Sequence, residues 1–187
     1  MDVPVMLSNR HVHLTQEDAD LLFGADGTSF DRYLSGDSGP FAIKETLTIV
    51  GSKGSIEKVK VLGPFRSYTQ AEVLRGDSFK LGIRPPIESS GHLDEAAELT
   101  LIGPCGQITR KCAIIAHAHI HMRQDIAESL GLKNGDSVSV KVGGIRALTF
   151  QNVLIQVGGR GLMMHIDTEE GNAACIKNGD ILQLLVK

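Results

Sequence analysis

The chain contains no tryptophan and lacks any apolar run of about 18 residues, the length that a membrane-spanning helix needs. It also lacks an excess of charge. Its 19 basic and 22 acidic residues leave a formal net charge of −3, without the basic footprint of nucleic-acid-binding proteins. No charged and then apolar leader opens the sequence, so we expect neither a secretory signal nor membrane attachment.

Cysteine is equally scarce, because only Cys105, Cys112 and Cys175 are present. The odd count and the absence of a CxxC spacing argue against a disulfide framework or a zinc ribbon. A reducing, cytoplasmic environment is the simpler expectation. We expect the three thiols to behave as small buried hydrophobic side chains, since no base is paired with them in the sequence.

What the chain does have is glycine, 21 residues in 187, together with short alternating apolar segments. This alternation predicts strands over 42–50, 55–63, 137–142 and 147–157. Turns rich in glycine, asparagine and aspartate separate these segments. The fold class expected is therefore mainly β with short helices, arranged as two small pseudo-repeated β-barrels packed together in one compact unit.

An internal sequence repeat supports the division of the chain into two similar halves. The segment HVHLTQEDADLL (11–22) matches HIHMRQDIAESL (119–130) at an offset of 108 residues, with five of twelve positions identical. Each copy is predicted to be a strand followed by a short helix, with Thr15 as the first helix cap and Gly24 and Gly131 as the two helix ends. The sequence repeat divides the chain into 1–92 and 93–187, with the proline-containing stretch 84–91 as the expected joint.

Histidines are concentrated at the start of both copies. Residues i and i+2 of a strand point to the same face, so His11 with His13, and His119 with His121, can each present two imidazoles to one ion. The later segments 59–66 and 153–160 match at an offset of 94 or 95, which implies an insertion at 24–40. Carried across by 94, Glu72 falls one residue from His165.

The repeat therefore predicts two sets of metal ligands: His11, His13 and Glu72, and His119, His121 and His165. Three imidazoles with an open position are typical of catalytic zinc. Two imidazoles and a carboxylate suit zinc as well as the facial triad of non-haem Fe(II) oxygenases. A cupin-like Fe(II) dioxygenase and a metal-binding protein without catalytic activity remain alternatives at this point.

Two arginines stand near these ligands in the sequence. Arg66 precedes Glu72 by six residues, and Arg160 is its counterpart in the second half. A guanidinium beside a metal site can bind phosphate or carboxylate through two parallel hydrogen bonds, although each arginine could equally form a surface ion pair. His117 either joins the face of His119 or lies at its rim. His92 has no partner nearby and receives no role.

Four motifs, taken together, resemble the PduL-type phosphotransacylases, or phosphate propanoyltransferases. They follow one another in order along the whole chain: SNRHVHL (8–14), GPFRSYTQAE (63–72), HIHM (119–122) and HIDTEEGNAA (165–174). The resemblance implies two β-barrels and interconversion of acyl-CoA plus phosphate with acyl phosphate plus CoA. It also implies two metal ions, usually zinc, held by the same six ligands that the repeat proposes.

Further roles are carried over by motif. Arg66 matches the catalytic, phosphate-binding arginine of the family, and Gln70 and Ser90 match polar residues that line the substrate site. We place Arg160 with these substrate-binding residues as the counterpart of Arg66. The family also suggests that the N-terminal strand, about residues 1–10, packs into the C-terminal barrel. Propionyl-CoA and acetyl-CoA are the expected substrates.

The sequence departs from the family pattern at Ala118, where an arginine usually stands, and at Gly171, where alanine is common. Members housed in bacterial microcompartments, as in propanediol degradation, carry an amphipathic extension before the first motif. Here the HxH pair begins at residue 11, so we expect either the non-encapsulated, cytoplasmic form or a chain from which the extension has been removed. A homo-oligomer is compatible with the resemblance. Because a thiolate leaves readily, direct attack of phosphate is favoured over an acyl-enzyme.

Overall fold

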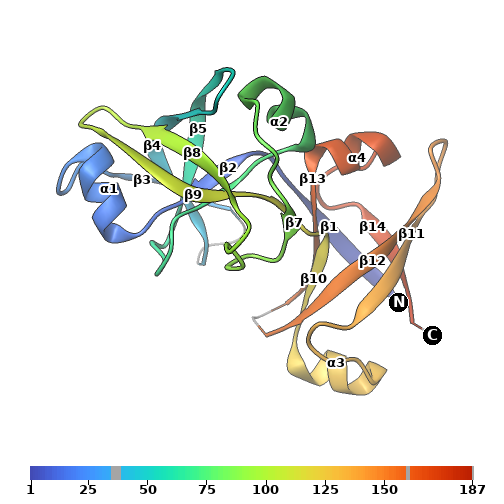
Figure 1. Cartoon of the computed structure of the whole chain (residues 1–187). Coiled ribbons are helices and arrows are strands. Elements are labelled where there is room, and N and C mark those ends of the chain that lie inside the picture. Colours follow the sequence, from blue (N-terminus) through green and yellow to red (C-terminus); the bar gives the residue numbers. More distant parts are fainter. Residues whose placement is uncertain (35–38, 159–160, 187) are drawn as a thin grey trace. The chain divides into compact units, whose positions relative to one another are not determined.

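The computed structural model describes residues 1–34, 39–158 and 161–186, and these are mainly β with four short helices (Figure 1). The chain forms two compact units. We call Arg10–Ala116 the central unit, and Met1–Asn9 with His117–Lys187 the terminal unit. Each contains a closed ring of six strands, so the mainly-β, two-barrel prediction is confirmed. Within the described residues, no helix has both the length and the apolar character required to cross a membrane.

The barrel of the central unit closes in the order β4-β5-β2-β6-β9-β8, with β8 returning to β4. Its strands are β2 (His11–His13), β4 (Phe41–Val50), β5 (Ser55–Gly63), β6 (Gln70–Glu72), β8 (Ala97–Ile102) and β9 (Gln107–Ala116). Two further strands are attached to it, β3 (Phe30–Tyr33) on β4 and β7 (Ile87–Glu88) on β9. Its helices are α1 (Gln16–Phe23) and α2 (Arg75–Leu81).

The barrel of the terminal unit closes in the order β1-β13-β10-β12-β11-β14. Its strands are β1 (Asp2–Ser8), β10 (His119–Met122), β11 (Ser137–Val142), β12 (Leu148–Val157), β13 (Leu162–Asp167) and β14 (Ile181–Leu185). Its helices are α3 (Gln124–Leu130) and α4 (Thr168–Ala174). The first strand of the chain, β1, pairs with β13 and β14, so this barrel is built from both ends of the sequence.

The two barrels share one pattern of strand pairing. Each strand that carries the two histidines lies between a parallel and an antiparallel neighbour: β2 between β5 and β6, and β10 between β12 and β13. His11 lies opposite Glu72, and His119 lies opposite His165. Glu72 and His165 therefore occupy the same register position, and the offset of one residue in the sequence repeat disappears.

The similarity between the two barrels extends to a backbone irregularity. Lys58 on β5 and Asn152 on β12, 94 residues apart, both adopt positive φ angles, of 56° and 58°. Each lies at a register shift, where the partner strand β4 or β11 is one residue shorter between paired positions. Such a bulge bends and twists a strand, which helps a six-stranded sheet to close.

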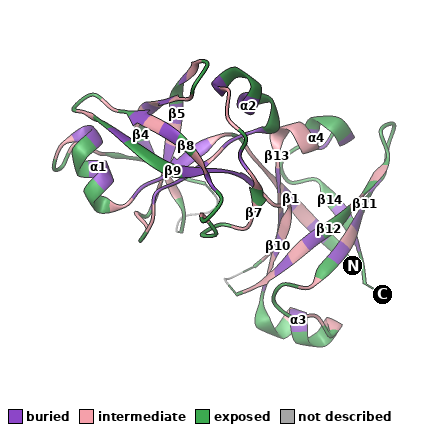
Figure 2. Ribbon diagram, in the orientation of Figure 1, coloured by how far each residue is buried: buried purple, intermediate pink, exposed green. Residues whose placement is uncertain are grey.

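The core of each barrel is formed by the alternating apolar residues that predicted the strands. Buried and more exposed positions alternate along β11, whereas β9 has four consecutive buried residues, 112–115; Figure 2 shows buried residues in purple. The predicted strands 42–50, 55–63, 137–142 and 147–157 coincide with β4, β5, β11 and β12 to within a residue. Each barrel has its own cluster of fully buried side chains, with Val12 and Leu14 in one and Ile120 and Met122 in the other.

Local signals for the helices are also confirmed. Thr15 caps α1 by accepting the N–H of Asp18, and Gly24 and Gly131 end α1 and α3 with positive φ. The stretch 24–40, expected as an insertion, includes strand β3, while residues 35–38 lie outside the described residues. The stretch 84–91, expected as a joint, lies inside the central unit.

The terminal unit contains a second repeat, which the sequence analysis did not use. LKNGD (132–136) and IKNGD (176–180) form matching turns after α3 and α4. The aspartate of each turn accepts the lysine N–H, at 2.7 Å in Asp136 and 2.8 Å in Asp180. The side chain of each asparagine accepts a backbone N–H, from Val157 on β12 and from Leu7 on β1. These turns fasten β12 and β1 into the barrel.

Candidate active site

Three of the predicted metal ligands converge in the central unit. The two histidines of β2 point to the same face, and antiparallel pairing with β6 brings Glu72 opposite His11. The Nε2 atoms of His11 and His13 lie 3.4 Å and 3.8 Å from the two carboxylate oxygens of Glu72. One ligand atom from each residue lies within 4.8 Å of the others. This spacing allows all three to reach one ion.

The protonation states of His13 and Glu72 suit a cation. Burial first, and then the neighbouring His11, lowers the pKa of His13 to about 3. Burial alone would raise the pKa of Glu72, but the electrostatic interaction with His11, the hydrogen bond to His11, and then the electrostatic interactions with His13 and Arg66 lower it to about 2. His13 directs its Nδ1 at the Leu62 carbonyl oxygen, 3.2 Å away, which leaves Nε2 to face Glu72. Neutral imidazoles and an ionised carboxylate are the forms that bind metal.

Arg66 is connected to this triad by a chain of hydrogen bonds. Its Nη1 donates to Ser90 Oγ at 2.8 Å, and Gln70 Nε2 donates to the same oxygen at 2.9 Å. Gln70 Nε2 also donates to Glu72 Oε1 at 2.8 Å. The amide oxygen of Gln70 accepts the N–H of Gly91, so this fully buried side chain is held at both ends. A guanidinium is thereby placed next to the possible metal ligands.

Tyr68 belongs to the same cluster and was missed by the sequence analysis. Its ring lies 5.8 Å from the Arg66 guanidinium, and its hydroxyl lies 3.4 Å from both Arg66 Nη1 and Ser90 Oγ. The residue stands inside the motif GPFRSYTQAE, but a single tyrosine between polar residues gives no signal of its own. Only the fold of residues 64–69 brings it against Ser90.

The second predicted set gathers in the terminal unit. His119 and His165 stack with nearly parallel rings, 5.2 Å between centroids, and His121 lies edge-on to both at 4.9 Å. The Nδ1 of His119 faces the His117 carbonyl oxygen at 2.8 Å, so Nε2 is the ring nitrogen that would take part in metal binding. Burial, and then His119, lowers the pKa of His121. All three are only partly buried, unlike His11 and His13.

The Nδ1 of His117 lies 3.0 Å from the Ala118 carbonyl oxygen, and its imidazole interacts electrostatically with Glu170. Glu170 was not singled out by the sequence analysis. Burial raises its pKa to about 7, although its carboxylate accepts the Asp167 N–H in the cap of α4 and has His117 nearby. The three-residue spacing of Asp167 and Glu170 indicates a capping box in the sequence. The burial of Glu170 cannot be inferred from that spacing.

The remaining predicted residues have separate outcomes. Arg160 lies outside the described residues. Cys112 is buried as expected, and burial raises the pKa of its thiol to about 12. Cys105 and Cys175 are exposed, so their predicted burial is wrong. Cys105 lies in a turn between β8 and β9, and Cys175 is the left-handed end residue of α4; both are surface positions.

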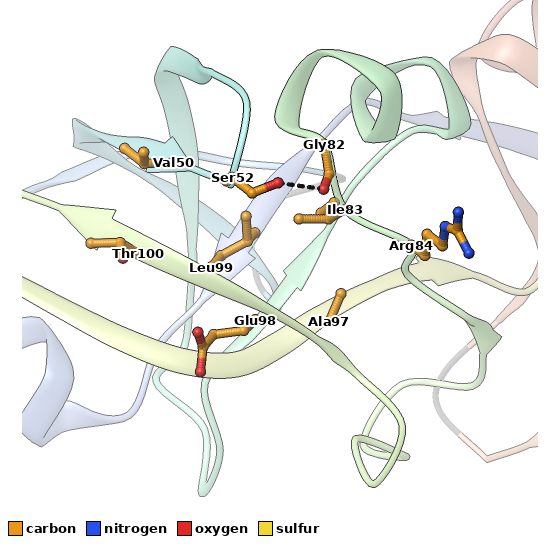
Figure 3. Close-up of a pocket in the computed structure, with 10 residues that line it drawn as sticks. Val50, Ser52, Gly82, Ile83, Arg84, Ala97, Glu98, Leu99 and Thr100 are labelled. Carbon is orange, nitrogen blue, oxygen red and sulfur yellow. Dashed lines mark hydrogen bonds between the residues drawn. The ribbon is translucent and has the colours of Figure 1, made fainter.

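A cavity of about 450 Å³ in the central unit lies apart from these side chains. It is formed by the end of β4, the turn that follows α2, and β8 (Figure 3). Ser52 and Gly82 form part of its wall, where the Ser52 hydroxyl donates to the Gly82 carbonyl oxygen at 2.7 Å. None of the predicted site residues lines this cavity. The candidate site is therefore defined by its hydrogen-bonded cluster and not by this hollow.

Comparison with known proteins agrees with the motifs. The profile of the family described as phosphate propanoyltransferase matches residues 4–177. The chain is 50% identical to the phosphate propanoyltransferase of Priestia megaterium over 180 residues, which cover 95% of this chain and 83% of that protein. It is 46% identical to the same enzyme of Rhodopseudomonas palustris, over 99% of this chain and 83% of that protein. The Thermotoga maritima enzyme is also 46% identical, over 97% of this chain and 88% of that protein.

Proposed function

Because the chain belongs to the phosphate propanoyltransferase family, a family of acyltransferases, we propose that it interconverts a short-chain acyl-CoA and phosphate with the acyl phosphate and CoA. Propionyl-CoA and acetyl-CoA are the substrates we assign to it. The observation that carries this proposal is the hydrogen-bonded path from Arg66 through Ser90 and Gln70 to Glu72. This path joins a guanidinium to the His11, His13 and Glu72 cluster within one unit, which supports the proposal.

The donor sets fit divalent zinc. His11, His13 and Glu72, whose ligand atoms lie within 4.8 Å of one another, would hold one ion. His119, His121 and His165, whose ring centroids lie no more than 5.2 Å apart, would hold a second. When bound, zinc supplies a Lewis acid that neutralises phosphate and polarises a thioester carbonyl. Arg66, Gln70 and Ser90 are the residues that we assign to substrate binding.

In this mechanism Arg66 binds and orients the phosphate. A guanidinium can donate two parallel hydrogen bonds to two phosphate oxygens, and Ser90 and Tyr68 hold this one in place before phosphate arrives. Gln70 keeps both Ser90 and the Glu72 carboxylate oriented. A phosphate oxygen held there attacks the thioester carbon, the carbon–sulfur bond breaks, and CoA leaves as the thiolate.

A direct attack is favoured over a covalent acyl-enzyme. Cys112 has a pKa of about 12 because of burial, so its thiol carries almost no thiolate at neutral pH. Ser90 Oγ accepts hydrogen bonds from two donors and has no imidazole among its described partners. Neither side chain therefore has the base that activates a nucleophile.

The test is release of free thiol from propionyl-CoA, with and without phosphate, before and after chelation. Phosphate-dependent release that chelation abolishes and Zn²⁺ restores is the expected result. Release without phosphate would indicate a thioesterase. Absence of release, with oxygen consumption restored by Fe²⁺, would favour the dioxygenase instead. Arg66→Ala should raise the KM for phosphate by about a hundredfold, while Arg84→Ala, an exposed arginine of the same unit, serves as the matched control.

A further inference from the structure

The loop between β5 and β6, residues 64–69, carries Arg66 and is tied to the end of β2 at two points. The N–H of Arg66 donates to the Leu14 carbonyl oxygen at 2.8 Å. The N–H of Thr15 donates to Thr69 Oγ1 at 3.2 Å. The path of this loop decides where the Arg66 guanidinium lies, so the groups that anchor the loop also determine the geometry of the proposed phosphate site.

A buried carboxylate completes the second of these anchors. Asp18, in the first turn of α1, is only 4% exposed. Its Oδ2 accepts the hydroxyl of Thr69 at 2.5 Å, and its Oδ1 accepts Nη2 of Arg110, from β9, at 2.7 Å. Thr69 therefore accepts from the backbone and donates to Asp18, and Asp18 joins α1, the loop and β9.

This arrangement differs from an ordinary helix cap. At α4, Asp167 and Glu170 bond each other's backbone N–H groups and close a capping box within one helix. At α1, Thr15 accepts the N–H of Asp18, but the return bond is indirect. The Thr69 hydroxyl is inserted between the Thr15 N–H and the Asp18 carboxylate. The cap of α1 thus extends to the loop that carries Arg66.

The equivalent positions of the terminal unit lack this network. The shared register places Leu162 at the position of Thr69, and the sequence repeat places Ile126 at that of Asp18. Both side chains pack against the apolar core of their barrel. A barrel with this topology therefore closes without a carboxylate there. Since a buried ion pair often contributes little net stability, the network in the central unit calls for another explanation.

We propose that Asp18 is a positioning residue of the transferase reaction, which acts through Thr69 and Arg110 to hold residues 64–69 so that Arg66 meets phosphate. This inference rests on the proposed function. Asp18 has no described bond to Arg66, Ser90, Gln70 or Glu72. Its side-chain bonds run to the Thr69 hydroxyl and the Arg110 guanidinium instead. Its loss should therefore affect phosphate binding more than acyl-CoA binding.

The first experiment separates the two Michaelis constants. Asp18→Asn and Thr69→Val should each raise the KM for phosphate by about tenfold or more, with the KM for propionyl-CoA changed less than about twofold. Thr69→Ser keeps the hydroxyl and should remain near the wild type. The matched control is Asp20→Asn, in the same helix, where the carboxylate is exposed and accepts Gln16 Nε2. A lower melting temperature with both constants unchanged would overturn the proposal.

A second measurement does not depend on activity. Hydrogen exchange should accelerate at the amides of Arg66 and Thr15 in Asp18→Asn, but not at those of β12. The double variant Asp18→Ile with Thr69→Leu introduces the apolar residues found at the equivalent positions of the terminal unit. It therefore tests the loss of the network in a chain that is expected to stay folded. It should remain folded and still show the raised phosphate KM, whereas wild-type kinetics in this folded variant would contradict the role. If the wild type releases no thiol, the proposed function is wrong. If hydrogen exchange at Arg66 and Thr15 is unchanged in Asp18→Asn, the proposal that Asp18 anchors residues 64–69 is wrong, whatever the activity.

Discussion

The two barrels have the same strand pairing but different polar groups at equivalent positions. Opposite the first histidine, the central unit has Glu72 and the terminal unit has His165. With neutral imidazoles, the first triad carries one negative charge and the second carries none. The central triad is also more deeply buried. The barrel topology therefore decides where the three side chains meet, and the difference between Glu72 and His165 decides their total charge.

The same contrast extends to the next position on the strand. Gln70 pairs with His13, and Met163 pairs with His121. Gln70 links Ser90, Glu72 and the backbone of Gly91, whereas a thioether offers no comparable donor. Gln70 therefore links Glu72 to the Ser90 hydroxyl that Arg66 also contacts, a link that Met163 cannot make at the paired position of the terminal unit.

The largest effect expected is on metal affinity. Glu72→Gln removes the charge of the central triad and should weaken zinc binding by at least about a hundredfold, since an ionised carboxylate attracts a dication strongly. His165→Gln removes a neutral ligand and should cost about tenfold. Bound zinc would be measured after dialysis against graded chelator, with Glu88→Gln as the control. Equal losses in the two variants would contradict the difference in charge.

A second prediction converts one barrel into the other at Gln70. Gln70→Met copies Met163 and leaves the N–H of Gly91 and the Glu72 carboxylate without their amide partner. We expect the free energy of unfolding to fall by about 2 kcal/mol, the cost of unsatisfied buried groups. Met163→Gln, at a half-buried position, should change it by less than about 1 kcal/mol. Urea denaturation of both variants tests this asymmetry, and a reversed order would refute it.

The pH dependence of stability should also differ between the units. Glu170, whose pKa is raised to about 7 by burial, binds a proton in the folded state between about pH 4.5 and 7 that the unfolded chain has already lost. Its contribution to stability is thus complete below pH 4.5 and is lost as the pH rises through 7. Glu170→Gln should gain about 2 kcal/mol relative to the wild type between pH 4.5 and 7.5.

Glu72 acts in the opposite direction. The pKa of its carboxyl is lowered to about 2, so its contribution is present above about pH 4.5 and is lost as the pH falls toward 2. Thermal unfolding of Glu170→Gln across this range would be compared with Glu169→Gln, which removes the same charge one residue earlier. A constant difference between Glu170→Gln and the wild type at every pH would show that burial does not raise the pKa of Glu170.

The smallest effect concerns the two bulges. Lys58 and Asn152 both have positive φ, a conformation that costs lysine more than asparagine. Lys58→Gly should therefore raise the stability by up to about 1 kcal/mol, and Asn152→Gly by a few tenths. Melting temperatures of the two variants measure the difference. A larger gain at Asn152 would mean that the two bulges are not equivalent in energy.

The sequence predicted much of this because its strongest signals are local. Alternating apolar residues identified β4, β5, β11 and β12, and the paired histidines identified β2 and β10. Cap residues such as Thr15 and Gly131 were readable because their bonds lie within a few residues. The turns at 132–136 and 176–180 are equally local, and their repetition is visible in the sequence.

Other features depended on contacts between distant segments. Tyr68 and Ser90 are 22 residues apart, and Asp18 and Arg110 are 92 residues apart, so no period in the sequence relates them. The exposed Cys105 and Cys175 were wrongly expected to be buried, because a cysteine's burial depends on where its turn lies in the fold.

By itself, the sequence determined the strands, the doubled histidine motif and the family, because residue spacing and type carry that information directly. Only the tertiary structure decided the register that makes Glu72 the counterpart of His165, since strand pairing joins positions that the sequence repeat left one residue apart. It also decided protonation. The pKa of Glu72 falls to about 2 and that of Glu170 rises to about 7, although both are glutamates, because burial and neighbouring charges exist only in the folded chain.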